Sequence, residues 1–394
     1  MALGGGVYRG ALEVVLTGEQ SIEDGEATVK NIMQELAVSE AHVLDGAYVD
    51  MLNNTSDSSL ERTPNGAAEL RRQPSPMRRF ATRISRTANL FHFVNNLSQW
   101  HFSCRKHYNL AWLVETGELT PVEREALQLY AAIARRFPYG EHWIGRAFIL
   151  ADDESQAWNG VSRTVEPSDV PVLRSIFETM TPRFEKIWQA DEPRLRKVRS
   201  ELQGVLETES VGAVLDVLSR FLGVAAPRMT IDLLLSRADG TAGGANEAAD
   251  HVTLEVLETA DLRHAVARVL HEAAHSMERP HFDRLFEAIS SEYGLDRLKG
   301  TMGWDGHHLV REALIGALFP GGCLSYLVGV PLFDYQREAQ RTRESGDLRM
   351  AGLYSLTGAV IPLVRSYVER CRLVDRALFE EAFHVFEALE PDIG

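Results

Sequence analysis

The feature that most constrains the fold is an uncharged stretch of 21 residues from Ala313 to Phe333. On length alone, such a stretch could cross a lipid bilayer as a helix. Pro320-Gly321-Gly322 interrupts it in the middle, however, and Pro331 interrupts it again near its end. The backbone groups freed there would lack hydrogen-bond partners in lipid, whereas a protein core can supply them. We therefore expect a helix followed by a buried loop in a globular core, and no stable membrane span.

The composition agrees with a large globular protein, because 45% of the 394 residues are apolar and 25% are charged. At about 100–200 residues per domain, this length predicts two domains or one large one. The 41 Lys and Arg against 56 Asp and Glu give a net charge of −15, which disfavours nucleic acid and anionic lipid as partners. Three widely separated cysteines favour reduced thiols, and the first twenty residues carry no export signal. We expect a cytoplasmic protein of unspecified oligomeric state.

The N-terminal part of the chain divides into two regions. Residues 1–75 are polar and glycine-rich, and we interpret them as a flexible arm or linker. From about residue 80 to 222 the apolar residues recur at helical spacing, so we assign 76–227 to a helical domain. Helix starts are predicted at Thr120-Pro121-Val122-Glu123, which has the pattern of a capping box, at Ser168-Asp169 and at Thr181-Pro182.

The only clear β pattern lies between the helical regions. Two short apolar runs, 229–235 and 252–256, are separated by a glycine-rich connection, which suggests a hairpin with a long loop. Helical patterns follow at 260–277, 281–293, 306–319, 334–345 and 350–390. The predicted fold class is α+β and mostly α-helical, with a second domain at 228–394 that contains one small sheet.

The predicted helix at 260–277 contains the pattern His271-Glu272-Ala273-Ala274-His275. Positions i and i+4 of a helix lie on one face about a turn apart, so the two imidazoles can bind one metal ion. Glu272 lies beside the first histidine, where a carboxylate can act as general base toward a metal-bound water. Zinc lowers the pKa of such a water to about 7, and the HExxH spacing favours Zn²⁺ as the cofactor.

This HExxH pattern, directly after the strand at 252–256, resembles that of the zincin metallopeptidases. With a downstream acidic helix the resemblance covers about residues 228–320, and the general appearance is similar to poorly characterised bacterial zincin-like proteins. The N-terminal helices match no peptidase family. The resemblance implies a zincin-like domain at 228–394 and an active cleft walled by the strand at 252–256. In zincins such an edge strand binds an extended peptide by strand addition.

A catalytic zinc site needs a third protein ligand and leaves its fourth position to water. Glu312, on the predicted helix 306–319, matches the gluzincin arrangement and is the favoured candidate. His308 lies one turn earlier on the same helix. His281 has the metzincin spacing, but Glu278 stands where that family has glycine for a sharp turn. If Glu312 binds the metal, His308 would lie beside it and could stabilise an oxyanion; Tyr354 is a remoter candidate for that role.

The predicted function is that of a zinc-dependent hydrolase, most simply a metallopeptidase that cleaves a peptide or other amide bond. His271, His275 and Glu312 would hold the metal, Glu272 would be the general base, and His308 would be the second catalytic residue. One alternative is a non-catalytic, metal-stabilised helical protein that binds a partner, for which a closed four-ligand site would be diagnostic. Another is an Fe(II) enzyme, because two histidines and one carboxylate also bind that ion.

Overall fold

A computed structural model describes residues 79–101, 104, 106–137, 143–237, 245–248, 250–257, 261–293 and 306–393. By its internal contacts the chain divides into two compact units, Met1–Arg71 and Arg72–Gly394. All the described residues belong to the second unit. The arm predicted at 1–75 lies outside the described residues.

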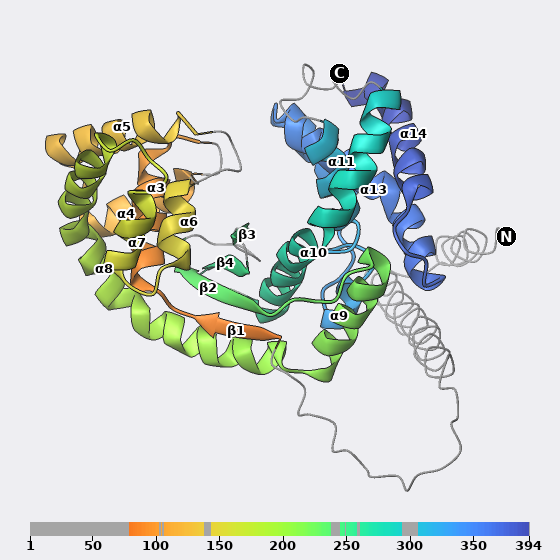
Figure 1. Cartoon of the computed structure of the whole chain (residues 1–394), viewed down its shortest axis with the longest axis horizontal. Coiled ribbons are helices and arrows are strands. Elements are labelled where there is room, and N and C mark those ends of the chain that lie inside the picture. Colours follow the sequence, from red (N-terminus) through yellow and green to blue (C-terminus); the bar gives the residue numbers. More distant parts are fainter. Residues whose placement is uncertain are drawn as a thin grey trace, which may run out of the picture. The chain divides into compact units, whose positions relative to one another are not determined.

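The structure is mostly α-helical with one small sheet, as the sequence predicts (Figure 1). In chain order the helices are α3 (Arg86–Ser98), α4 (Lys106–Thr116), α5 (Pro121–Ala134), α6 (Trp143–Leu150), α7 (Glu154–Val161), α8 (Asp169–Leu206), α9 (Glu209–Leu222), α10 (Leu262–Tyr293), α11 (Gly306–Gly316), the 3-10 helix η2 (Ser325–Val328), α12 (Tyr335–Glu344), α13 (Leu348–Glu369) and α14 (Arg376–Ile393).

The sheet has the strand order β1-β2-β4-β3. Its strands are β1 (Phe80–Arg83), β2 (Met229–Leu235), β3 (Ala245–Ala248) and β4 (His251–Val256). The first three strands in this order run parallel, while β3 pairs antiparallel with β4. Among the described residues, β3 and β1 are therefore the edge strands, and β4 is internal. The strand at 252–256 is thus not the edge strand that the sequence predicts, because β3 pairs with it on its outer side.

The predicted hairpin between 229–235 and 252–256 is wrong in its direction. β2 and β4 are parallel neighbours, with Ile231 opposite Val252 and Leu235 opposite Val256. The chain leaves β2, forms β3, and returns as β4 between the two. Every residue of β2 except Thr230 is buried, and a continuous buried run is typical of a strand covered on both faces rather than of a half-exposed hairpin.

Strand β1 was not expected, because only four residues form it and its sequence ends in arginine. Its pairing with β2 places a segment of the predicted range 76–227 in the same sheet as the predicted range 228–394. Past the end of β1, the buried Asn89 side chain of α3 continues this edge pairing. Its amide donates to the Leu233 carbonyl at 2.9 Å and accepts from the Leu235 amide at 2.7 Å.

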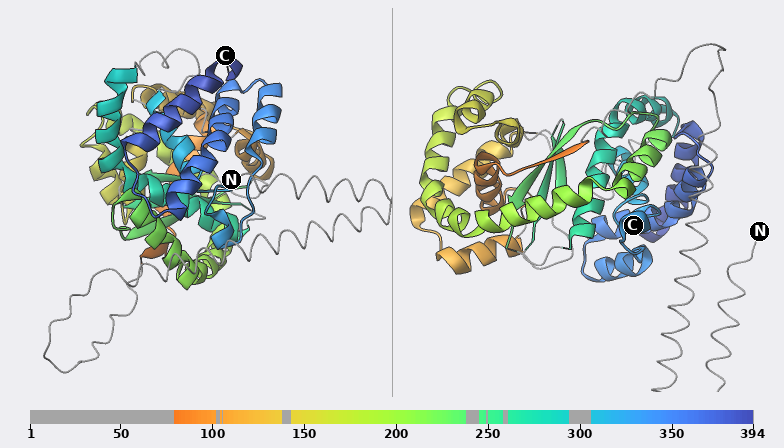
Figure 2. Two further views of the ribbon diagram at one scale, coloured as in Figure 1. Left: turned by 90° about the vertical axis from the view of Figure 1, so that its right-hand side faces the viewer. Right: turned by 90° about the horizontal axis from the view of Figure 1, so that it is seen from below.

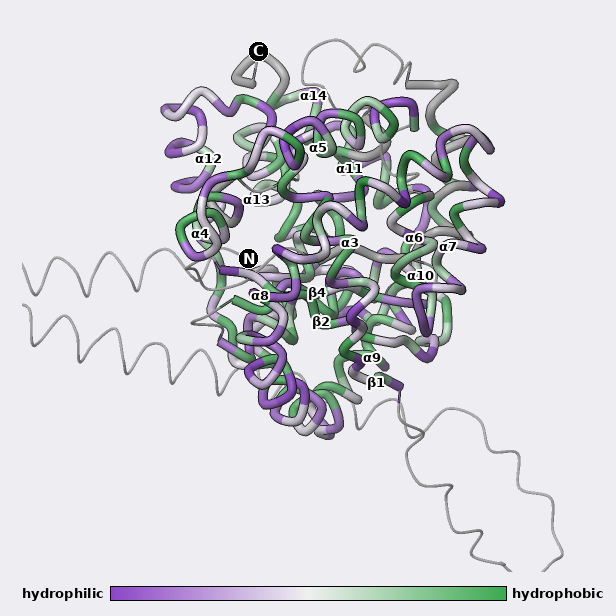
Figure 3. The backbone as a smooth tube through the Cα atoms, turned by 90° about the vertical axis from the view of Figure 1, so that its left-hand side faces the viewer, coloured by the Kyte–Doolittle hydropathy of each residue, from purple (hydrophilic) through white to green (hydrophobic). Residues whose placement is uncertain are grey.

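Helices lie on both sides of the sheet. α3 and α6 contact the strands from the first part of the unit, and α10 contacts β3 and β4 from the second part. Figure 2 shows the strands between these two groups of helices, with α8 running alongside. Hydrophobic residues concentrate in the strands and on the inner faces of the helices, as the hydropathy colouring of Figure 3 shows. Helix α10 is therefore backed by a continuous core.

Several helix boundaries differ from the predicted ones because tertiary packing overrides local signals. α8 begins at Asp169 as predicted but continues through Pro182, so Thr181-Pro182 is not a helix start. Buried residues on both sides, such as Met180 and Phe184, hold that helix together. α10 is one helix across the predicted break at 278–280. The predicted helix at 350–390 divides into α13 and α14, and Asp375 caps α14 by accepting from the Leu378 amide.

In the part of the chain that the structure describes, no helix is long and apolar enough to span a membrane. The uncharged stretch at 313–333 forms the last turn of α11 and then a compact loop that contains η2. Most of its residues are buried, including Phe319 and Cys323. The prediction of a helix followed by a buried loop is confirmed.

Candidate metal centre

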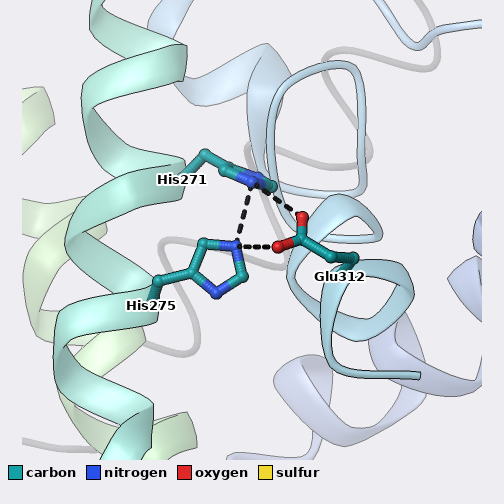
Figure 4. Close-up of side chains that lie close together, drawn as sticks. All are labelled: His271, His275 and Glu312. Carbon is teal, nitrogen blue, oxygen red and sulfur yellow. Dashed lines mark hydrogen bonds and ion pairs between the residues drawn. The ribbon is translucent and has the colours of Figure 1, made fainter. Parts of the chain in front are cut away.

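Helix α10 carries the HExxH pattern, and its local sequence sets which side chains face the core. Ala273 and Ala274 are buried, as are Leu270 one turn earlier and Val266 two turns earlier. The same helix contacts β3 and β4. Small alanines in the middle of the motif allow this close packing. The two histidines, four residues apart, project together from the helix toward α11 (Figure 4).

Helix α11 places Glu312 opposite the two histidines (Figure 4). Its neighbours Val310, Ala313 and Leu314 are buried, and the helix packs closely on α13. A Cβ added at Gly316 would lie 3.1 Å from the Thr357 side chain, so the glycine permits this approach. Glu312 remains on the side of α11 that contacts α10.

Three side chains converge at this point with the spacing that a metal ion requires. The Nε2 atoms of His271 and His275 lie 3.1 Å apart. The Glu312 carboxylate oxygens lie 3.4 Å from Nε2 of His275 and 3.6 Å from Nε2 of His271. Two ligand atoms bound tetrahedrally to zinc at 2.0–2.1 Å are about 3.3–3.4 Å apart. The donor set and its spacing therefore fit a tetrahedral divalent cation.

The orientation of His271 is set by a backbone carbonyl. Its Nδ1 lies 2.7 Å from the carbonyl oxygen of Phe319, in the loop after α11. Because a carbonyl can only accept, this contact requires the proton on Nδ1, and in the neutral ring the Nε2 lone pair is then free for a metal. Sequence reasoning missed this contact, since a backbone carbonyl has no residue signature. The Pro-Gly-Gly interruption of the apolar stretch was the only indication of irregular backbone there.

Glu312 carries a negative charge between the two imidazoles. Burial raises the pKa of its carboxyl, but the charge of His275 and hydrogen bonding to both histidines outweigh burial and hold this pKa well below its usual range. These effects of the histidines need protons on their Nε2 atoms, so they describe the metal-free site, in which the Glu312 carboxyl is already deprotonated, as a metal ligand must be. The Glu312 side chain is 30% exposed, which leaves the triad accessible to solvent on the side of α11.

Glu272 follows His271 on α10 and is buried, at 9% exposure. Its carboxylate makes no hydrogen bond or ion pair with any described residue. A carboxylate without a hydrogen-bond partner among the described residues can accept a proton, and its place in the motif puts it beside the first histidine. Its role as general base stays a prediction.

The other predicted site residues have different outcomes. The side chains of His308 and His281 lie outside the described residues, so their roles stay predictions. Because α10 continues past position 281, its backbone does not make the sharp turn that the metzincin spacing requires. Tyr354 lies on α13 among aromatic rings, with centroid distances of 6.0 Å to Phe333 and 6.1 Å to Tyr335.

Comparison of the chain with protein-family models, curated proteins and solved structures finds no match.

Proposed function

We propose that the protein is a zinc-dependent hydrolase, and specifically a metallopeptidase that cleaves a peptide or other amide bond. The observation that carries this proposal is the convergence of His271, His275 and Glu312 from two helices at distances suited to one tetrahedral ion. Three protein donors leave one position of such an ion for water, which is the pattern of catalytic rather than structural zinc.

Bound zinc would supply Lewis acidity and a water of lowered pKa. The residues of the chain provide the remaining parts. Glu272 would accept the proton of the attacking water and deliver it to the leaving amine. The Phe319 carbonyl keeps His271 in the tautomer that can bind the ion. His308 at the start of α11 is proposed to stabilise the oxyanion, since it precedes Glu312 by one helical turn.

Strand β3 supports a peptide as the substrate class. It is an edge strand within the described part of the sheet, and it contacts α10, the helix that carries the triad. Edge strands can pair with an extended peptide through backbone hydrogen bonds, and such a peptide would lie alongside the metal centre. The proposal includes a reducing, cytoplasmic location without a nucleic-acid partner, supported by free thiols at Cys104, Cys323 and Cys371 and by the net charge of −15.

Metal analysis and hydrolysis assays test the proposal together. We expect one zinc per chain in the wild-type protein and none in His275→Ala. We expect Glu272→Gln to keep the zinc but to lose about 10²–10⁴-fold in the rate of cleavage of a fluorogenic peptide library. Glu201→Gln removes an exposed carboxylate of α8 that pairs with Lys197, and this control variant should match the wild type in both measurements.

The outcomes separate the proposal from its alternatives. Full activity in Glu272→Gln would show that the assigned base is wrong. Zinc held by four protein donors, without hydrolysis, would instead indicate a metal-stabilised binding protein. Iron in place of zinc would indicate an Fe(II) enzyme.

A further inference from the structure

The loop between α11 and α12, residues 317–334, supplies the carbonyl that orients His271, so the rigidity of this loop bears directly on the metal centre. Its backbone must satisfy many buried carbonyl groups without regular secondary structure. Backbone amides of the same loop donate hydrogen bonds to the carbonyls of Ala317, Leu318, Gly321 and Gly322. Two side chains bind three other carbonyls of this region. His271 donates to the Phe319 carbonyl, and Tyr335 donates to those of Gly316 and Pro320.

Tyr335 is the first residue of α12 and reaches back to the start of the loop. Its hydroxyl lies 3.0 Å from the Gly316 carbonyl oxygen and 2.8 Å from that of Pro320. Both carbonyls can only accept, so the single hydroxyl proton serves the two in a shared hydrogen bond. The ring is buried, and burial raises the pKa of Tyr335 above its ordinary value, which keeps the hydroxyl protonated as a donor.

The two carbonyls that Tyr335 binds lie on either side of the Phe319 carbonyl in the sequence. Pro320 directly follows Phe319 in the chain, and Gly316 is the last residue of α11, three residues before Phe319. The loop is also closely packed, because a Cβ added at Gly322 would lie 2.3 Å from the backbone of Ala317. Because the Tyr335 hydroxyl holds the carbonyls of Gly316 and Pro320, the Phe319 carbonyl between them keeps a fixed direction toward α10.

We propose that Tyr335 is a positioning residue of the metal centre, which acts on His271 through the Phe319 carbonyl. Loss of the hydroxyl leaves two buried carbonyls without their donor, and the loop must shift or admit water to satisfy them. A shifted Phe319 carbonyl weakens the hydrogen bond that fixes the tautomer and ring direction of His271. Groups that orient a metal-binding histidine in this way change metal affinity by about 10–100-fold when they are removed.

Two measurements on Tyr335→Phe test this role. The first uses the metal-free protein with labelled histidine, where nuclear magnetic resonance follows exchange of the His271 Nδ1 proton with water. The signal is assigned by its absence in His271→Asn. We expect exchange about tenfold faster in Tyr335→Phe than in the wild type. The second is zinc affinity by competition with a chromophoric chelator, in which we expect a dissociation constant raised about tenfold.

The matched control is Tyr367→Phe, which removes another buried hydroxyl, one that lies 3.1 Å from Asp375 on the connection before α14. It should leave both measurements unchanged. Unchanged exchange and affinity in Tyr335→Phe would overturn the proposal, as would equal changes in Tyr367→Phe. The zinc measurement rests on the proposed function, but the exchange measurement does not. A wild-type protein that binds no zinc would therefore refute the metallopeptidase, while the exchange of the His271 proton still decides the role of Tyr335.

Discussion

A buried ion pair joins α8 to the first turn of α5, and it allows a stability prediction. The Arg183 guanidinium binds both carboxylate oxygens of Glu123, at 2.8 Å each. It also donates to the Thr116 hydroxyl and to the carbonyls of Gly117 and Glu118 at 2.6–2.9 Å. All five contacts use one charged group that is 8% exposed, so the network is a bidentate, charge-assisted one rather than a surface pair.

The pKa of Glu123 gives the magnitude. Hydrogen bonding to Arg183 lowers this pKa from 4.5 to about 2. A change of that size corresponds to about 3 kcal/mol of folding free energy, which we reduce to about 2 kcal/mol for screening by solvent at the rim of the network. Because the folded-state pKa is the lower one, the stabilisation is complete well above pH 4.5 and disappears as the pH falls toward 2.

The perturbation that isolates this charge is Glu123→Gln. The residue is also the third in α5, where its side chain accepts from the Thr120 amide, and glutamine can keep that capping contact. We expect the free energy of unfolding in urea, followed by circular dichroism, to fall by about 2 kcal/mol at pH 7. At about pH 3.5 the difference from the wild type should shrink by about 1 kcal/mol, because there the wild-type carboxylate has itself lost part of its stabilisation.

The control for this prediction is Glu192→Gln, which breaks an exposed pair with Arg196 at 2.7 Å on the same helix as Arg183. Exposed pairs of this kind contribute little, so its effect should stay below about 0.5 kcal/mol. The reasoning is refuted if Glu123→Gln is as stable as the control at pH 7. It is also refuted if the deficit of Glu123→Gln is the same at both pH values.

Two further predictions concern the thiols and the loop after α11. Burial raises the pKa of Cys104 to about 11 and that of Cys323 to about 12. We therefore expect only the exposed Cys371 to react with a thiol reagent in the native protein, and all three cysteines to react after unfolding in denaturant. Three reactive thiols in the native state would contradict this prediction. Gly322→Ala puts a Cβ 2.3 Å from the backbone of Ala317, so we expect calorimetry to show a free energy of unfolding lower by about 3 kcal/mol. A loss below about 1 kcal/mol would show that the loop can relax around the added methyl group.

Local features of the fold were predictable because their causes lie within a few residues. The capping box at Thr120 forms as expected, with the Glu123 amide donating to the threonine hydroxyl at 3.2 Å. The spacing of His271 and His275 puts both imidazoles on one face of α10, since four residues make about one helical turn. The choice of Glu312 among the candidate ligands followed from the resemblance to the gluzincin arrangement, and the structure brings that carboxylate to the two histidines.

Features that depend on distant partners were not predictable in the same way. Thr181-Pro182 has the local pattern of a helix start, yet α8 passes through it because buried neighbours on either side pack into the core. The parallel pairing of β2 with β4 depends on β3 folding back outside β4. A pattern of apolar residues marks a strand but not its neighbour or its direction, and β4 itself pairs parallel with β2 and antiparallel with β3.

By itself, the sequence determined the helical periodicity, the caps, the two imidazoles on one turn, and the burial of the uncharged stretch at 313–333. Each of these follows from side-chain chemistry and a repeat of a few residues. Only the tertiary structure decided that the Phe319 carbonyl meets His271, which is 48 residues away, and that Tyr335 braces the loop between them. Every residue has the same backbone carbonyl, so the sequence does not mark which one accepts the hydrogen bond from a buried side chain. The folded path of the chain decides it.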